Sequence, residues 1–497
     1  MRVVTLGLLA WTCLIAAAAA AQSPAPSPAT PPVKAPSSTP RFKLPVVDTA
    51  MPWTGDLDGM VKRRAIRVLV PYSRTYYFVD RGIQRGLAYE VSQIAETEIN
   101  KTLKTGNLRV HVVCVPVARD RMMPALLDGR GDVAVGNLTI TPERLKRVDF
   151  SNPTSRNVSE IVVSGPGAEP IGTLEDLSGK QIYVRKSSSY YESLQGLNAE
   201  LAKARKPPVR IKLAPENLEA EDILEMVNAG LVKMTVVETY LADFWEQIFT
   251  KLTLHPTVAV RTGGEIAWMI RKDSPKLKAE LNGFLARFEK SGQGSDVLAR
   301  YLKSTKWAKG ATSTAEIRKF ERTVALFREY GNRYDLDYLL LMAQGYQESE
   351  LNQNARSRVG AIGIMQVMPS TGRDMRVGDI TQIDPNIHAG TKFLRAMINE
   401  HYANEPMDTL NKGLFAFAAY NAGPGRVQQL RRLATQRGLD PNVWFNNVEL
   451  MAAEKIGRET VTYVSNIYKY YLAYQMIEEE RAERDKTKAA IKEGASK

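Results

Sequence analysis

The chain has 497 residues, a length that excludes a single ordinary domain and predicts two or three. Hydrophobic residues make up 44% of the sequence, which is ample for packed cores. The formal net charge of +13 favours an anionic partner such as nucleic acid, a membrane surface or an acidic cell-wall polymer; the alternative is a basic surface with no such partner.

The N-terminus predicts export. Arg2 precedes an apolar run from Val3 to about Ala18, and three small residues, Ala19 to Ala21, come just before Gln22. This is the pattern of a secretory signal peptide over residues 1–21, with an A-x-A-type cleavage site. The apolar run is short for a membrane span, so a retained anchor is the less favoured alternative.

The cysteines and histidines predict no special chemistry. Cys13 lies inside the predicted signal peptide, and the Ala10-Trp-Thr12 that precedes it does not fit a lipoprotein signal. Cys114 lies in the apolar segment Arg109–Pro116, so we predict a buried strand in which it is a core residue and not a nucleophile. The four histidines are scattered without metal-ligand spacing, and we predict no metal site and no cofactor.

Residues 22–42 are mostly Pro, Ala, Ser and Thr, and we predict an extended tether there. From 43 to 305 short strands alternate with helices, which predicts an α/β domain of two lobes. The expected strands are Ile66–Val70, Val133–Val135, Ile161–Val163 and Ile182–Arg185, and the expected helices are Leu87–Leu103, Ile223–Val227 and Leu277–Phe288.

A segment of mainly Lys, Ser, Thr, Gly and Ala, from about Lys303 to Thr314, is predicted to be a linker. Beyond this linker the pattern is helical throughout, and we assign residues 306–475, which include most of the linker, to an all-helical domain. Residues 476–497 are predicted to form a charged helix that frays into a tail. The expected helices of this half are Ile317–Tyr334, Tyr338–Gln347, Ile387–Tyr402, Leu414–Tyr420, Arg426–Thr435 and Thr460–Ile477.

Several short motifs follow one another in the helical half. They are Gln347-Glu348-Ser349, Ala355-Arg-Ser357, Gly360-Ala-Ile-Gly-Ile-Met-Gln366, Met368-Pro-x-Thr371, Ala419-Tyr-Asn-Ala-Gly-Pro-Gly425 and Glu459-Thr-x-x-Tyr-Val464. Each motif alone is weak, but their order and spacing are specific. From about residue 317 to 471 the chain resembles the soluble-lytic-transglycosylase domain, which implies a goose-type-lysozyme-like fold.

Glu348 is the candidate catalytic acid. Cleaving a glycosidic bond requires a proton for the leaving oxygen, and a glutamate at the end of an apolar helix can supply it if burial raises its pKa. The apolar run Leu339–Gln344 leads to Glu348. Apart from Glu459, the motifs contain no clear second carboxylate, which glycosidases ordinarily use.

The resemblance implies how one carboxylate suffices. The family cleaves the MurNAc-GlcNAc β-1,4 bond of peptidoglycan without water. The N-acetyl group of the substrate attacks the anomeric carbon, and the glutamate then acts as a base on the 6-hydroxyl, which leaves a 1,6-anhydro-MurNAc end. Glu348 takes both roles in this chain by resemblance.

Further site residues follow by resemblance, each matched to its motif. Ser357 and Gln366 are expected to hydrogen-bond near the acid or the N-acetyl group, and Met365 and Met368 to line the sugar site. Tyr420 and Asn421 are expected to close the cleft, and Glu459 to support it from the last helix. The alternatives are that the methionines are core residues and that Glu459 is a structural hydrogen-bond acceptor. The segment Ile456-Gly-Arg458 departs from the family, in which a proline and an aromatic residue are common.

The N-terminal half carries a second set of ordered motifs, Leu127-x-Gly-Arg-Gly-Asp132-Val-Ala-Val135, Thr139-Ile-Thr-Pro-Glu-Arg144 and Val148-Asp-Phe-Ser151. From about residue 64 to 301 it resembles family-3 solute-binding proteins of the amino-acid type. The resemblance implies that Arg144 clamps a ligand carboxylate, that Thr139 adds a hydrogen bond and that Glu238 holds an amine. The alternative is a lobe pair that has lost its ligand and docks the catalytic half.

Together the two halves resemble a membrane-bound type of lytic murein transglycosylase. This implies a periplasmic enzyme of cell-wall turnover, with peptidoglycan as partner, an amino acid or muropeptide sensed by the first half, and peripheral association with the outer membrane. We expect no nucleic-acid partner. Two alternatives stay open: a solute-binding receptor anchored to peptidoglycan by a non-catalytic domain, which the intact motif residues disfavour, and a hydrolytic lysozyme.

Overall fold

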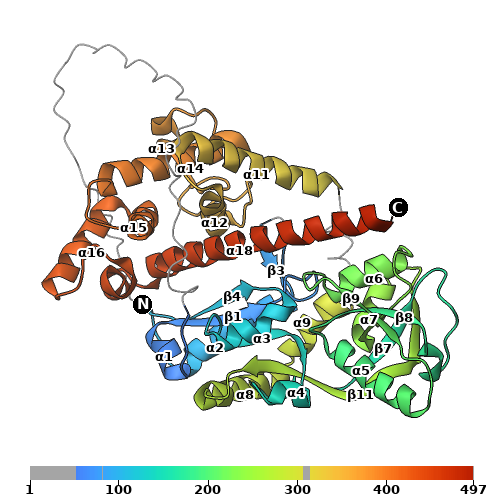
Figure 1. Ribbon diagram of the computed structural model, residues 1–497. Coiled ribbons are helices and arrows are strands. Elements are labelled where there is room, and N and C mark those ends of the chain that lie inside the picture. The colour runs from blue at the N-terminus through green and yellow to red at the C-terminus, as the bar shows by residue number, and fades with distance from the viewer. Residues whose placement is uncertain (1–51, 81, 306–313, 496–497) are drawn as a thin grey trace, which may run out of the picture. The chain divides into compact units, whose positions relative to one another are not determined.

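The computed structural model describes residues 52–80, 82–305 and 314–495 (Figure 1). The predicted signal peptide, the predicted tether and Cys13 lie outside these residues, as does most of the predicted linker between the halves. All described residues belong to one unit of contacting elements, Arg41–Lys497. Within the described ranges, no helix combines the length and apolar character that a bilayer crossing needs.

The N-terminal half is built on a seven-stranded sheet with the order β10-β7-β11-β5-β1-β4, in which β6 also pairs with β11. Strand β1, Ala65–Val70, pairs in parallel with β4, His111–Pro116, and with β5, Val133–Thr139. Every β1 residue after Ala65 is buried, as expected for a strand covered on both faces. The other strands are β2 (Phe78–Asp80), β3 (Ile83–Arg85), β6 (Asp149–Phe150), β7 (Ser155–Ser164), β8 (Gln181–Arg185), β9 (Arg210–Ala214), β10 (Met234–Glu238) and β11 (Thr253–Ile270).

Two long antiparallel strands, β7 and β11, connect two lobes with separate apolar cores (Figure 1, blue to yellow-green). Val68 and Ile270 lie in a core of the first lobe, and Val162 and Val236 lie in that of the second. The first lobe contains α1 (Leu57–Lys62), α2 (Leu87–Thr102), α3 (Arg119–Leu127), α8 (Pro275–Lys290) and α9 (Gln293–Leu302). The second contains α5 (Ser189–Lys203), α6 (Ala220–Asn228) and α7 (Thr239–Glu246), and the short helices α4 (Pro142–Leu145) and η1 (Glu175–Leu177) lie in connections.

The C-terminal half is helical and has its own core (Figure 1, yellow to red). Its central helix is α12, Tyr338–Ser349, in which every residue from Leu339 to Gly345 is buried, as a helix surrounded by others requires. Helices α11 and α18 pack against α12. The other elements are α11 (Thr314–Tyr334), α13 (Pro369–Met375), α14 (Ile383–Met397), the π-turn η2 (Ile398–Tyr402), α15 (Thr409–Ala422), α16 (Pro424–Gln436), the π-turn η3 (Trp444–Val448), α17 (Glu449–Lys455) and α18 (Arg458–Ala495).

The prediction of a two-lobed α/β half followed by an all-helical half is confirmed. Cys114 is buried in β4, as expected. The short helices α13 and α17 are additions to the predicted set. The charged segment from Glu478 onward continues α18 as a helix to Ala495.

Candidate active site

Glu348 lies in the last turn of α12, where the apolar helix emerges from the core. Asp337 caps the start of this helix by accepting a hydrogen bond from the Leu339 amide at 2.9 Å. The helix stops because Glu350 and Leu351 both have left-handed backbone conformations, with φ of 53° and 60°. Consecutive left-handed residues other than glycine are costly, and such strain is concentrated at functional sites.

The surroundings of Glu348 favour the protonated form of its carboxyl group. Burial raises the pKa of Glu348 to about 7, although the hydroxyl of Tyr463 on α18 opposes this by donating to Glu348 Oε1 at 2.5 Å. The buried Gln344 donates in turn to the Tyr463 hydroxyl at 3.3 Å. A carboxyl group with this pKa is about half protonated at neutral pH, which suits a general acid that must later act as a base.

A loop and Tyr420 form the wall next to the carboxyl group. The Tyr420 hydroxyl donates to the carbonyl oxygen of Met365 at 2.8 Å, and burial together with the charge of Glu348 raises the pKa of Tyr420. Asn386 fixes the same loop, since its side chain accepts from the Met365 amide at 2.9 Å and donates to the Ile362 carbonyl at 2.8 Å. The loop is therefore held by hydrogen bonds at defined points beside Tyr420.

Gly363 allows this loop to pass close to α14. Its φ is +78°, and a Cβ atom there would lie 2.5 Å from Asn386 Nδ2 and 2.7 Å from Gln353 Nε2. A side chain at this position would therefore disrupt the amide contacts that fix the loop. Gln366 also has a left-handed backbone, with φ of 43°, and its side-chain amide donates to the Gly363 carbonyl at 2.8 Å.

The other predicted site residues have different environments. Ser357 accepts a hydrogen bond from the Ala361 amide at 2.9 Å and so closes its own loop. Asn421 accepts from the Thr460 hydroxyl at 2.7 Å, which joins α15 to α18.

The two methionines differ in exposure. Met365 is fully buried in the helical core, which agrees with the alternative that it is a core residue, whereas Met368 is 38% exposed. Glu459 is exposed in the first turn of α18. Met368 and Glu459 are therefore accessible to a polymer chain.

Tyr463 contacts the candidate acid, and it is not among the site residues predicted from the sequence. It lies in the last of the quoted motifs, one helical turn after Glu459, but an apolar-rich helix gives no reason to separate this tyrosine from its buried neighbours. Its significance depends on the packing of α18 against α12.

In the solute-binding half, Arg144 is engaged by the protein itself. Its guanidinium donates to the carbonyl oxygens of Thr139 and Ser187 at 2.8 and 3.0 Å. The Thr139 hydroxyl lies 3.2 Å from that of Ser189, at the start of α5. Burial lowers the pKa of Arg144, but a guanidinium remains charged at neutral pH.

Glu238 ends β10 and is fully buried, and it accepts a hydrogen bond from the hydroxyl of Tyr190, the second residue of α5. Burial raises the pKa of Glu238 to about 7. The three predicted ligand-binding residues are thus linked through the N-terminal turn of α5. Among the residues that the structure describes, no group of three or more His, Cys, Asp or Glu side chains is suited to hold a metal ion.

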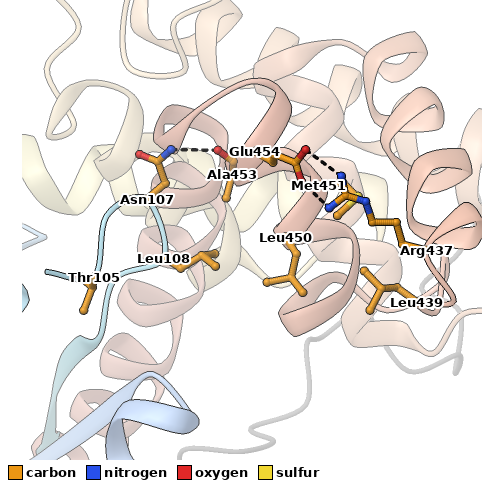
Figure 2. Close-up of a pocket in the computed structure, with 9 residues that line it drawn as sticks. All are labelled: Thr105, Asn107, Leu108, Arg437, Leu439, Leu450, Met451, Ala453 and Glu454. Atoms are coloured by element: carbon orange, nitrogen blue, oxygen red, sulfur yellow. Dashed lines mark hydrogen bonds and ion pairs between the residues drawn. The ribbon is translucent and has the colours of Figure 1, made fainter. Parts of the chain in front are cut away.

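A separate cavity of about 520 Å³ contains none of the predicted site residues (Figure 2). Asn107 crosses one side of it and donates to the Ala453 carbonyl at 2.9 Å, and Arg437 pairs with Glu454 at 2.6 Å. Its lining residues are Thr105, Asn107, Leu108, Arg437, Leu439, Leu450, Met451, Ala453 and Glu454.

Comparison with known proteins agrees with the two halves. Residues 71–304 match the family model of bacterial extracellular solute-binding proteins, family 3, and residues 325–442 match the transglycosylase SLT domain. An experimental structure of the ancestral amino acid-binding protein AncCDT-1, a precursor of cyclohexadienyl dehydratase, aligns with 50% of this chain and 99% of its own, with 23% identity and a TM-score of 0.41.

Several relatives match the chain across both halves. The membrane-bound lytic murein transglycosylase F of Desulfosudis oleivorans is 24% identical over 428 residues, which cover 82% of this chain and 89% of the relative. That of Ectopseudomonas mendocina is 27% identical over 433 residues, which cover 82% and 83%. The chain thus combines a family-3 solute-binding domain with a following SLT domain, and over most of its length it is similar to membrane-bound lytic murein transglycosylases F.

Proposed function

We propose that the chain is a peptidoglycan lytic transglycosylase that cleaves the β-1,4 bond between MurNAc and GlcNAc and leaves a 1,6-anhydro-MurNAc end. The observation that carries the proposal is Glu348, a carboxyl group at the end of a buried helix with a pKa raised to about 7 by burial. The SLT domain and the full-length relatives support the same reaction.

The reaction has two steps, and each requires a different protonation state of Glu348. The protonated carboxyl group first gives its proton to the glycosidic oxygen while the N-acetyl oxygen of MurNAc bonds to C1 and the C1–O4 bond breaks. The carboxylate, which accepts a hydrogen bond from the Tyr463 hydroxyl, then removes the proton of the 6-hydroxyl. O6 displaces the N-acetyl oxygen from C1, so Glu348 ends protonated and no water is consumed.

Mass spectrometry of peptidoglycan digested by the full chain tests this function. Lytic chemistry produces muropeptides whose masses are lower by one water than those of hydrolysis products, because the anhydro ring replaces the reducing end. Muropeptides with reducing ends would identify a hydrolytic lysozyme. A digest without soluble products would favour the receptor with a non-catalytic domain.

The proposed setting is the periplasm, after removal of residues 1–21, with peripheral association with the outer membrane. The net charge of +13 suits an acidic cell-wall polymer. N-terminal sequencing of the protein isolated from cells tests the processing, and recovery of Met1 would contradict it.

We further propose that the solute-binding half senses an amino acid or a muropeptide and tunes the catalytic half. Arg144 provides a cationic group and Glu238 a carboxyl group, both placed at the start of α5, which suits a ligand with opposite charges. A bound ligand alters catalysis only as far as its affinity differs between two states of the protein.

Isothermal titration of the full chain with amino acids and with muropeptides is expected to give binding that Arg144→Ala weakens by about tenfold or more, because one charge-assisted interaction is lost. Arg147→Ala is the matched control, since Arg147 is an exposed arginine three residues away. If no ligand of either class produces heat, the first half is not a sensor of these compounds.

A further inference from the structure

The last part of α18 contacts the solute-binding half. The first turns of this helix pack in the helical core, but Ala473 and Ile477 belong to the apolar core of the first lobe. Lys469 lies 3.5 Å from Glu96 of α2, and the Tyr474 hydroxyl donates to the carbonyl of Gly82. Residues after Ile477 therefore start from a helix that is already docked on the first lobe.

Arg484 contacts both lobes. Its guanidinium donates to the Tyr72 carbonyl of the first lobe at 3.1 Å and to Asp222 Oδ1 of α6, in the second lobe, at 2.6 Å. Arg484 is 6% exposed and Asp222 1% exposed, so this ion pair is shielded from water. The guanidinium also lies over the Tyr72 ring, 5.5 Å from its centre.

Lys488, one helical turn later, reinforces the contact with the second lobe. Its ammonium group lies 2.7 Å from Asp222 Oδ1 and 3.5 Å from Glu225. Although burial opposes ionisation, Arg484 and Lys488 hold the pKa of Asp222 down to about 2. Between them, Thr487 accepts a hydrogen bond from Asn217 at 2.8 Å. The acidic residues of α6 thus pair with a basic segment of α18 that lies more than 250 residues later in the sequence.

The two lobes are in contact at the same place. Arg119 of the first lobe pairs with Glu219 of the second at 2.8 Å, and the Ser73 hydroxyl donates to Glu221 at 2.9 Å. The Arg74 amide donates to Glu221 at 2.6 Å. Beside Arg484 a polar cavity of about 10 Å³ remains, which is about the space of one water molecule. The lobes are closed at this edge of the cleft, and Arg484 forms part of the closure.

We propose that the C-terminal end of α18 is an internal clasp that holds the two lobes closed, so that a solute enters the cleft after Arg484 and Lys488 have left α6. Opening the lobes separates Tyr72 from Asp222. The Arg484 guanidinium cannot then keep its hydrogen bonds to both residues. A buried ion pair that loses a partner is strongly unfavourable, so opening must release the clasp as a whole. The inference rests on the proposed solute-binding role of the lobe pair and does not depend on the lytic reaction.

Hydrogen exchange of the full chain, followed by mass spectrometry without added solute, tests the clasp. The double variant Arg484→Ala, Lys488→Ala is expected to exchange about tenfold faster at the Arg74 amide, which lies at the contact between the lobes, because closure loses charge-assisted bonds. Lys486→Ala is the matched control, since it removes the same charge from an exposed position on the same helix. It is expected to leave this exchange unchanged.

Two readouts make the experiment decisive. The amides of α12 are expected to exchange equally in all variants, which shows that the helical half stays folded. Arg484→Lys in the Lys488→Ala background is expected to restore part of the protection, since it returns the charge. The proposal fails if the Arg74 segment is as protected in the double variant as in the wild type. It also fails if the amides of α12 exchange faster in the double variant.

Discussion

The Glu348→Gln variant is expected to release anhydromuropeptides about 10²–10⁴-fold more slowly than the wild type, because an amide can neither give the leaving oxygen a proton nor accept one from the 6-hydroxyl. The amide keeps the size of the carboxyl group and can still accept the hydrogen bond from Tyr463. The measurement is the initial rate of soluble muropeptide release from purified peptidoglycan. Glu350→Gln is the matched control, because Glu350 is exposed two residues away and should retain activity.

The same Gln variant is expected to be more stable than the wild type at pH 8, by about 1–3 kcal/mol. Burial raises the pKa of Glu348 from its ordinary 4.5 to about 7, so the folded state binds this proton more tightly than the unfolded state does. Wild-type stability therefore falls as the pH rises from 4.5 to about 7, and the deficit is complete above that range. Thermal unfolding at pH 5 and pH 8 measures it, and a folded variant with near-normal cleavage would remove Glu348 from the catalytic role.

The position of Glu348 at the end of a buried helix could be predicted from the sequence because the evidence is local. The apolar run before Glu348 predicts a buried helix, and the helix end carries the carboxyl group toward the surface. The side chain of Met365 could not be placed in the same way. It lies between two loop residues, and its burial depends on Gly390 of α14, where a Cβ atom would come within 2.5 Å of it.

The contacts that could not be predicted from the sequence join residues that lie far apart in the chain. Tyr463 contacts Glu348 across 115 positions, and this pairing depends on how α18 packs against α12. The charged composition after Glu478 predicts a helix that frays into a tail, whereas Arg484 is buried because Asp222 lies opposite. A local sequence pattern shows that a residue is polar. It cannot show that a residue of opposite charge, from the other half of the chain, packs against it.

The motif that contains Asp132 has a physical basis in the structure. Asp132 precedes β5 and is fully buried beside the equally buried Arg67. It accepts hydrogen bonds from the Arg67 amide at 2.8 Å and from its guanidinium at 3.0 Å. Arg63 pairs with the same carboxylate, and Arg271 lies 3.6 Å from it. One carboxylate thus compensates three guanidinium groups of the first lobe.

Asp132→Ala is expected to destabilise the first lobe by about 3–5 kcal/mol, because it removes the carboxylate that compensates the buried charge of Arg67. Hydrogen exchange of the full chain measures this at β1, where protection should fall by about 10²–10³-fold, while the amides of α12 in the other half keep theirs. Asp128→Ala removes the same charge from an exposed position four residues earlier and is expected to change stability by less than about 0.5 kcal/mol.

Asp132→Asn retains a hydrogen-bond acceptor without the charge, so its effect should fall between the two. If Asp132→Ala left β1 as protected as in the wild type, the three arginines would be stabilised by their backbone carbonyl partners, such as the Gly129 carbonyl 2.6 Å from Arg67, and not by the carboxylate.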